Sequence, residues 1–132
     1  MRLWHITLVE KGCLPKGQLV AQWRELNSIF KKQDNHILIN YIYNYDKAYL
    51  KAYADKVIAE MKRRGYKIKS FENYDKYFEG FSCWGGEQFM EHNNEYLTIC
   101  YWNLVEKFRR KQRDFDKSTF NKLHETYMDL WR

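Results

Sequence analysis

The sequence predicts an all-α protein: a single compact domain of three principal helices, a C-terminal helix and long aromatic-rich loops. Two observations lead to this prediction. Apolar residues recur every three or four positions in four separate segments, which is the spacing of one helix face. Residues that favour helix ends precede or follow those segments. Because 132 residues can bury one modest core but not two, we expect residues 1–132 to form one domain.

The first nine residues are apolar with polar interruptions, and we expect them to form a short strand or an extended arm. The segment is too short to form a helix on its own. It must nevertheless pack against the rest of the protein, because its large apolar side chains are costly to leave in water. These side chains are Leu3, Trp4, Ile6, Leu8 and Val9. Such packing fixes the start of the chain in place.

The first principal helix is predicted over residues 16–32, after a lead-in that contains the only proline. Its apolar stripe consists of Leu19, Trp23, Leu26 and Phe30. On the opposite face two small residues, Ala21 and Ser28, lie side by side between Arg24 and Glu25. Small residues between a cation and a carboxylate leave room for another segment of the chain or for a substrate. An ordinary solvated helix face is the alternative interpretation.

A second principal helix follows a turn at residues 33–35 and a connector at residues 37–45. The connector fits a short irregular or helical segment as well as a strand. Asp46 is the expected N-cap of the helix and Arg64 its last residue, with Gly65 just past the end. Its stripe consists of Leu50, Ala54, Val57 and Met61. The basic residues of its last turn complement the helix dipole, so we assign them no binding role.

The second half of the chain predicts a loop and two more helices. Residues 66–89 have no clean period and predict an aromatic-rich loop that wraps over the helices. Asn93 or Asn94 caps the third principal helix, whose stripe is Leu97, Tyr101, Leu104 and Phe108. Its end is strongly basic, through Lys107, Arg109, Arg110, Lys111 and Arg113. Asp116 or Ser118 caps the terminal helix. The side chains of this helix that we expect to face the core are Phe120, Leu123, Tyr127 and Leu130.

The charge balance indicates a polyanionic partner. A net charge of +6 and a pI near 9.2 are high for so small a domain, although basic proteins without such a partner also exist. Aromatic residues make up 18% of the chain, and eleven of them are tyrosines. Tyrosine suits a wet surface that stacks on bases, but it serves equally well to fill a small core.

We expect a cytoplasmic protein without a membrane segment, metal or other cofactor. No stretch approaches the ~18 apolar residues of a membrane span, and the interrupted apolar start of the chain does not fit a signal peptide. Three widely spaced cysteines predict reduced thiols instead of disulfides. Cys83, His92 and Cys100 could be considered as metal ligands, but their spacing fits no closed zinc site.

Several stretches, in their order and spacing, resemble one known family. They are Arg2 followed by residues 6–9 (ITLV), residues 21–26 (AQWREL) followed by residues 29–30 (IF), residues 45–47 (YDK) leading to residues 58–68 (IAEMKRRGYKI), and, more weakly, residues 104–108 (LVEKF). These resemble the pyrimidine-dimer DNA glycosylase family, typified by endonuclease V of a T-even bacteriophage. The opening MRLWH, the WRE of residues 23–25 and the NHIL of residues 35–38 resemble a bacterial and viral branch of it.

This resemblance implies a DNA glycosylase with abasic-site (β-elimination) lyase activity on damaged or modified double-stranded DNA, with pyrimidine dimers as the expected lesion. In the family the nucleophile is the α-amine of the first residue, and the glutamate of an Arg-Glu pair is the essential carboxylate. Carried over to this chain, these are Met1 and Glu25. Arg2 and Arg24 are then the implied contacts to phosphate or to the reaction intermediate.

Two further DNA contacts are expected from the basic end of the third helix. Lys107 matches a basic position in the third helix of the family, and Arg110 lies one turn further along. We expect the protein to bind DNA as a monomer.

The chemistry of the N-terminal amine agrees with this assignment. With a pKa near 8, roughly a tenth of it is unprotonated at neutral pH, far more than of any lysine. It is therefore the amine best suited to attack a sugar C1′ and form a Schiff base. The bulk of Arg2 blocks removal of the initiator methionine, so Met1 carries this amine. A carboxylate such as Glu25 is needed to move protons and to stabilise positive charge on the sugar.

Two other functions fit the same sequence. One is a non-catalytic nucleic-acid-binding module derived from this family, which binds DNA without forming a covalent adduct. The other is a glycosylase that acts on nucleotides or nucleosides, for which binding would not depend on salt.

Overall fold

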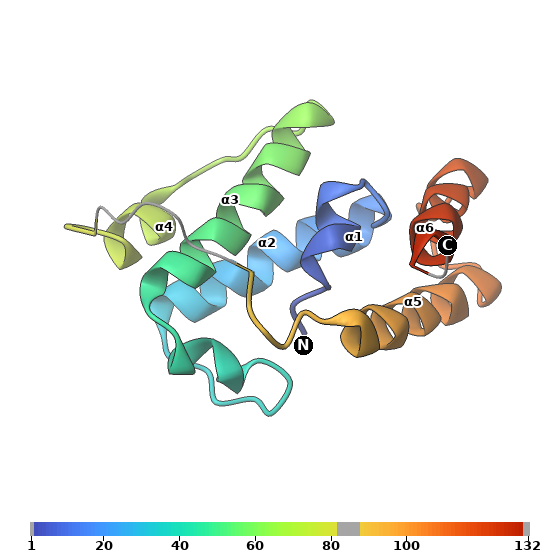
Figure 1. Ribbon diagram of the computed structural model, residues 1–132. Helices are drawn as coiled ribbons and strands as arrows, with labels where there is room; N and C mark the ends of the chain where they lie inside the picture. Colours follow the sequence, from blue (N-terminus) through green and yellow to red (C-terminus); the bar gives the residue numbers. More distant parts are fainter. Residues whose placement is uncertain (1, 82–87, 131–132) are drawn as a thin grey trace.

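The computed structural model of the protein describes residues 2–81 and 88–130 (Figure 1). Within these ranges the chain forms six α-helices, one short 3₁₀-helix and no β-strand, which confirms the all-α prediction. No helix among these residues is long and apolar enough to span a membrane. The elements are α1 (Ile6–Glu10), α2 (Lys16–Lys31), η1 (Asn40–Asn44), α3 (Lys47–Arg63), α4 (Glu72–Tyr77), α5 (Asn94–Arg109) and α6 (Lys117–Asp129).

Helices α2 and α3 pack on one another, with α1 against α3 and α4 against α2 (Figure 1). The stripe predicted for α3 is confirmed, since Leu50, Ala54, Val57 and Met61 are all buried. Helices α5 and α6 form a separate pair, joined by two stacked ring pairs. The ring centroids lie 3.8 Å apart for Tyr101 and Tyr127 and 4.1 Å apart for Phe108 and Phe120.

The predicted N-caps of α3, α5 and α6 are confirmed by capping hydrogen bonds, whereas α3 ends at Arg63, one residue before the predicted end. The carboxylate of Asp46 accepts from the Ala48 N–H at the start of α3. Asn93 and Asp116 cap α5 and α6 in the same way. Gly65, just past α3, has a φ of +78°, the left-handed conformation that its position requires.

The prediction that residues 1–9 contain no helix is wrong for their second half, which begins α1. The His5 side chain accepts from the Thr7 N–H and so caps the first turn of this helix. Five residues do not form a stable helix alone, but Leu8 and Val9 are completely buried against the rest of the protein. Tertiary packing therefore supplies the stability that the short segment lacks. Residues 2–5 form the predicted extended arm.

The loop predicted over residues 66–89 contains one further helix, α4. Its aromatic side chains pack edge-on against Phe30 of α2, which confirms that the segment wraps over the helices. The rings of Tyr74 and Phe78 lie 6.0 and 5.4 Å from the Phe30 ring. Residues 40–44 form η1, so the helical alternative for the connector is the correct one.

An ion-pair cluster at the end of α3 is joined to the turn between α1 and α2, because Arg64 Nη2 donates to the Leu14 carbonyl at 2.8 Å. The Glu60 carboxylate is almost fully buried and binds Arg63 at 2.6 Å and Arg64 at 2.9 Å. Burial alone raises the pKa of Glu60, but the two guanidinium groups outweigh it and hold the pKa below the ordinary value. Gly12 lies above this cluster with a φ of +71°.

Replacement of Gly12 by alanine is expected to destabilise the protein more than the same replacement of Gly80. Both glycines have a φ of +71°, so both variants incur the left-handed backbone cost of about 1–2 kcal/mol. A Cβ on Gly12 would also lie 3.1 Å from Arg63 Nη2 and 3.2 Å from Glu60 Oε2, whereas nothing lies within 4 Å of one on Gly80. Urea unfolding of the two variants measures the difference, and equal losses of stability contradict this account.

Candidate active site

The N-terminal arm, residues 2–5, is held by a buried glutamine of α2. The Gln22 side chain is 1% exposed, and its Oε1 accepts from the Trp4 N–H at 2.8 Å. Its Nε2 donates to the Arg2 carbonyl at 3.1 Å. The hydroxyl of Tyr53 on α3 lies 2.7 Å from the Trp4 carbonyl and 2.8 Å from Gln22 Oε1, so its single proton is shared between them. Two helices thus bind the backbone of the arm.

The second half of the chain supplies two more contacts. The Tyr96 hydroxyl, at the start of α5, donates to the Leu3 carbonyl at 2.6 Å. Just before α5, His92 Nδ1 accepts from the Ile6 N–H at 3.1 Å, where the arm enters α1. Because Nδ1 accepts, the neutral ring carries its proton on Nε2, which lies 2.8 Å from the Tyr41 hydroxyl. The polar backbone of a buried, non-helical segment is thereby satisfied by side chains.

The same glutamine binds the candidate catalytic carboxylate. Gln22 Nε2 donates to Glu25 Oε2 at 3.1 Å, so the Arg2 carbonyl and the Glu25 carboxylate share one amide nitrogen. Glu25 is half-buried. Burial raises the pKa of its carboxyl group, and the neighbouring Arg24 acts in the opposite direction. A raised pKa keeps a carboxyl group protonated up to a higher pH than usual, which favours a role in proton transfer.

Arg24 extends from α2 into an open groove of about 640 Å³. Three lysines also line this groove, namely Lys16, Lys67 and Lys69, together with the rings of Trp23 and Tyr66. No carboxylate among the described residues lines it. Four cations beside aromatic rings form a surface that attracts phosphate and offers stacking contacts.

The other predicted contacts, Arg2, Lys107 and Arg110, do not line this groove. The Arg2 guanidinium lies over the rings of Trp4 and Tyr96, at 5.9 and 5.8 Å from their centroids. Arg110 is exposed at the end of α5, with its Nε 3.8 Å from the Glu106 carboxylate. No described hydrogen bond or ion pair joins Lys107 or Arg110 to the carboxylate on α2. Met1, the predicted nucleophile, lies outside the described residues.

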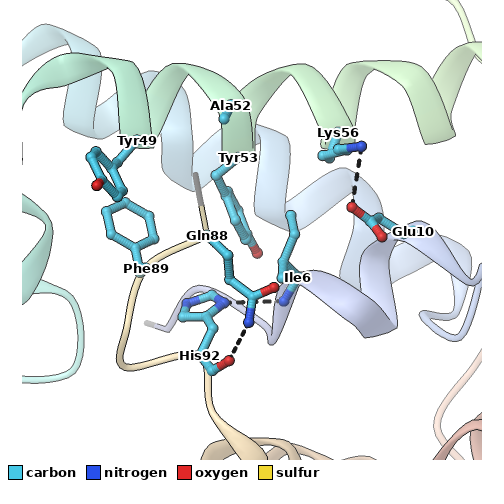
Figure 2. A pocket seen from close by; sticks show the side chains of 9 residues that line it. All are labelled: Ile6, Glu10, Tyr49, Ala52, Tyr53, Lys56, Gln88, Phe89 and His92. Atoms are coloured by element: carbon cyan, nitrogen blue, oxygen red, sulfur yellow. Dashed lines mark hydrogen bonds and ion pairs between the residues drawn. The ribbon is translucent and has the colours of Figure 1, made fainter. Parts of the chain in front are cut away.

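A second, smaller cavity of about 80 Å³ lies between α1, α3 and residues 88–92 (Figure 2). It is lined in part by Tyr53, Phe89 and His92, and His92 bonds to Ile6 at its edge. Ligand sites usually occupy several hundred cubic ångströms, so this cavity is too small for a nucleotide. We interpret it as part of the anchorage of the arm.

Sequence analysis missed the residues that hold the arm, Gln22, Tyr53, His92 and Tyr96. One signal was present: Gln22 lies three residues after Leu19 and four before Leu26, both completely buried, on the apolar side of α2. A polar residue in an apolar stripe indicates a buried hydrogen-bond partner. The predicted stripe contained Trp23 in its place, but Trp23 is only half-buried and borders the groove.

Among the described residues there is no group of three or more histidines, cysteines or carboxylates that could hold a metal ion. Of the three residues first considered as ligands, Cys83 lies outside the described residues. Cys100 is a buried free thiol, as is Cys13.

Comparison with models of protein families gives a match. The model of the pyrimidine dimer DNA glycosylase family matches residues 1–73. The chain belongs to the pyrimidine dimer DNA glycosylase family. Comparisons with curated proteins and with solved structures found no match.

The segment matched to the pyrimidine dimer DNA glycosylase family contains the arm, α1, α2 and α3, and with them Gln22, Glu25 and Tyr53. It ends inside α4, before His92 and Tyr96. The carboxylate and the amide that binds it thus lie in the part of the chain that defines the family. The anchors contributed by the second half lie beyond that part.

Because His92 is neutral in the folded protein, the free energy of unfolding is expected to decrease as the pH is lowered. Burial, with a smaller effect from nearby His5, lowers the pKa of His92 from 6.5 to about 3. Between these values the unfolded chain binds a proton that the folded protein does not, so stability falls as the pH falls. The slope for one group is about 1.4 kcal/mol per pH unit.

The His92→Asn variant tests this expectation, because an asparagine amide oxygen can still accept from the Ile6 N–H and does not titrate. We expect the variant to be less stable at pH 7 but to lose less stability than the wild type between pH 6.5 and 4. Urea unfolding at several pH values measures this loss. His36→Asn is the control, since His36 is exposed, and its acid dependence should match the wild type. If the stability of His92→Asn changes with pH as steeply as that of the wild type, His92 is not the group responsible for the acid dependence.

Proposed function

We propose that the protein is a DNA glycosylase with abasic-site lyase activity that uses the α-amine of Met1 as nucleophile and Glu25 as acid–base group. One observation carries the proposal: a single buried amide nitrogen, that of Gln22, binds both the Arg2 carbonyl and the Glu25 carboxylate. Met1 directly precedes Arg2 in the chain, so anchoring of the Arg2 backbone favours an amine close to this carboxylate. Membership of the pyrimidine dimer DNA glycosylase family supports pyrimidine dimers as the lesion.

The reaction begins when the unprotonated amine attacks C1′ of the damaged nucleotide. A C1′–N bond to the protein forms, and the glycosidic bond breaks with its electron pair leaving on the base, which takes up a proton. The sugar ring opens to a Schiff base. Loss of a C2′ proton then expels the 3′ phosphate by β-elimination. The half-buried Glu25 carboxylate, with its raised pKa, accepts and returns protons in these steps.

We propose double-stranded DNA as the substrate, bound by a monomer through Arg2, Arg24, Lys107 and Arg110. The groove that contains Arg24 extends this set, because its three lysines present cations without an opposing carboxylate among the described residues. Phosphate contacts of this kind hold the duplex in register while the target nucleotide leaves the stack.

Borohydride reduction in the presence of a duplex with an abasic site or a pyrimidine dimer should trap a covalent protein–DNA complex. Glu25→Gln is expected to lower the trapping rate by roughly a hundredfold or more, the usual contribution of a positioned acid–base group. Appending residues before Met1 should abolish trapping, because the amine is then displaced. Glu79→Gln is the matched control, since Glu79 is an exposed carboxylate after α4, and it should trap like the wild type.

The same experiment separates the alternatives. A non-catalytic binding module would bind these duplexes in a salt-dependent manner and yield no adduct. An enzyme acting on free nucleotides would show binding indifferent to salt. Wild-type trapping by Glu25→Gln would remove the role assigned to that residue.

The proposed binding of DNA phosphates in the groove that contains Arg24 is tested by the salt dependence of DNA affinity. We expect the double variant Lys67→Ala/Lys69→Ala to reduce the slope of log affinity against log salt by about 0.9 for each phosphate that the protein no longer neutralises. Lys31→Ala/Lys32→Ala is the control, because it removes the same charge from exposed residues at the other end of α2. Fluorescence anisotropy with a labelled duplex at several salt concentrations gives both slopes. Equal changes of slope in the two double variants would show that DNA binding depends on net charge alone and not on the lysines of the groove.

A further inference from the structure

We infer that Gln22 is a positioning residue of the active site: its side-chain amide holds the backbone of the N-terminal arm and the Glu25 carboxylate in a fixed relation. The inference rests on the proposed function, since it concerns the geometry between an amine at the start of the chain and this carboxylate. The residue touches no substrate in this role, and it acts through the two groups that do.

The amide of Gln22 is fully used by its neighbours. One N–H of Nε2 donates to the Arg2 carbonyl and the other to Glu25 Oε2, both at 3.1 Å. Oε1 accepts from the Trp4 N–H at 2.8 Å and lies 2.8 Å from the Tyr53 hydroxyl. With 1% of the residue exposed, water does not replace these partners.

No other side chain of similar size satisfies all four of these partners. A carboxylate retains the acceptor but has neither donor, and a hydrocarbon has neither function. Only a primary amide on this length of side chain donates to a carbonyl and a carboxylate while it accepts from a backbone N–H. The chemistry of the site therefore requires glutamine at this point of an otherwise apolar helix face.

The hydrogen bond from Gln22 also affects the ionisation of Glu25. A donor stabilises the charged carboxylate, so removal of the donor raises the pKa of Glu25 further above its ordinary value. The Arg24 cation on the same helix also lowers the pKa of this carboxyl group, and it remains in place when residue 22 is changed.

Two variants separate the acceptor role of Gln22 toward the Trp4 N–H from its two donor roles toward the Arg2 carbonyl and Glu25. Gln22→Glu keeps the acceptor for the Trp4 N–H but removes both donors and places a second carboxyl group beside Glu25. Gln22→Leu removes all of these hydrogen bonds. The control is Gln18→Leu, one turn earlier on α2, where the side chain instead donates to Gln112 at 3.0 Å.

The expected results differ among the variants. Gln22→Leu and Gln22→Glu should trap DNA about tenfold or more slowly than the wild type at neutral pH, the order expected when a hydrogen bond to a charged group is removed. The acidic limb of the pH–trapping profile should move to higher pH in both, and furthest in Gln22→Glu, where like charges meet. Gln18→Leu should retain the wild-type rate and profile.

Two readouts that need no activity accompany the assay. An NMR titration of the Glu25 carboxyl carbon should give a higher pKa in both Gln22 variants. Hydrogen exchange of the Trp4 amide should accelerate in Gln22→Leu and stay near the wild-type rate in Gln22→Glu. If the variants leave the Glu25 titration and the Trp4 exchange unchanged, or if Gln18→Leu alters them equally, the inference is overturned.

The experiments distinguish failure of this inference from failure of the proposed function. A wild-type protein that yields no adduct refutes the proposed function, and the titration and exchange data then still decide whether Gln22 couples the arm to Glu25. Wild-type trapping with full activity in both Gln22 variants refutes the coupling alone.

Discussion

The burial of an extended segment at the start of the chain is the constraint on which the structure depends. Leu3 is completely buried and Trp4 nearly so, yet the backbone of residues 2–5 lies in no helix or sheet that could satisfy its polar groups. Unpaired N–H and C=O groups in such an environment cost about as much as the burial of an apolar side chain gains. The protein resolves this conflict with side chains from α2, α3 and the start of α5.

The same solution explains why the candidate site lies where it does. The helix that supplies an amide to the arm also carries Glu25 three residues later, so one turn of α2 meets both groups. The hydrogen bond from Arg64 to the Leu14 carbonyl joins the end of α3 to the turn between α1 and α2, and the rings of Tyr74 and Phe78 pack on Phe30 of α2. Packing far from the carboxylate thereby limits how far the arm can move from it.

Much of the helical framework could be predicted because its signals are local. The cap residues Asp46, Asn93 and Asp116 act on N–H groups two or three positions away, and the apolar stripe of α3 repeats within its own segment. Helices α1 and α4 were not predicted, because partners elsewhere in the chain stabilise these short elements. Glu25 came from a resemblance and from its position beside Arg24.

The network around the carboxylate could not be read from local pattern. Tyr53 lies 31 residues from Gln22, and only the folded arrangement of α2 and α3 brings the two together. Both Trp23 and Gln22 fit the period of a helix face, and the larger apolar residue was the natural choice for the core. The structure places the amide inside and the indole at the edge of the groove, because the buried arm needs a polar partner.

The contacts that join the arm to the second half of the chain impose an order of events during synthesis. Ile6 bonds to a residue 86 positions later, and Leu3 to one 93 positions later. Residues 3–6 therefore reach their final contacts only after residues 92–96 have been synthesised. A nascent chain that stalls after α4 contains the carboxylate, the amide and the segment matched to the family, but it lacks His92 and Tyr96, two of the four side chains that hold the arm. All four side chains that hold the arm are thus present only once residues 92–96 have been synthesised.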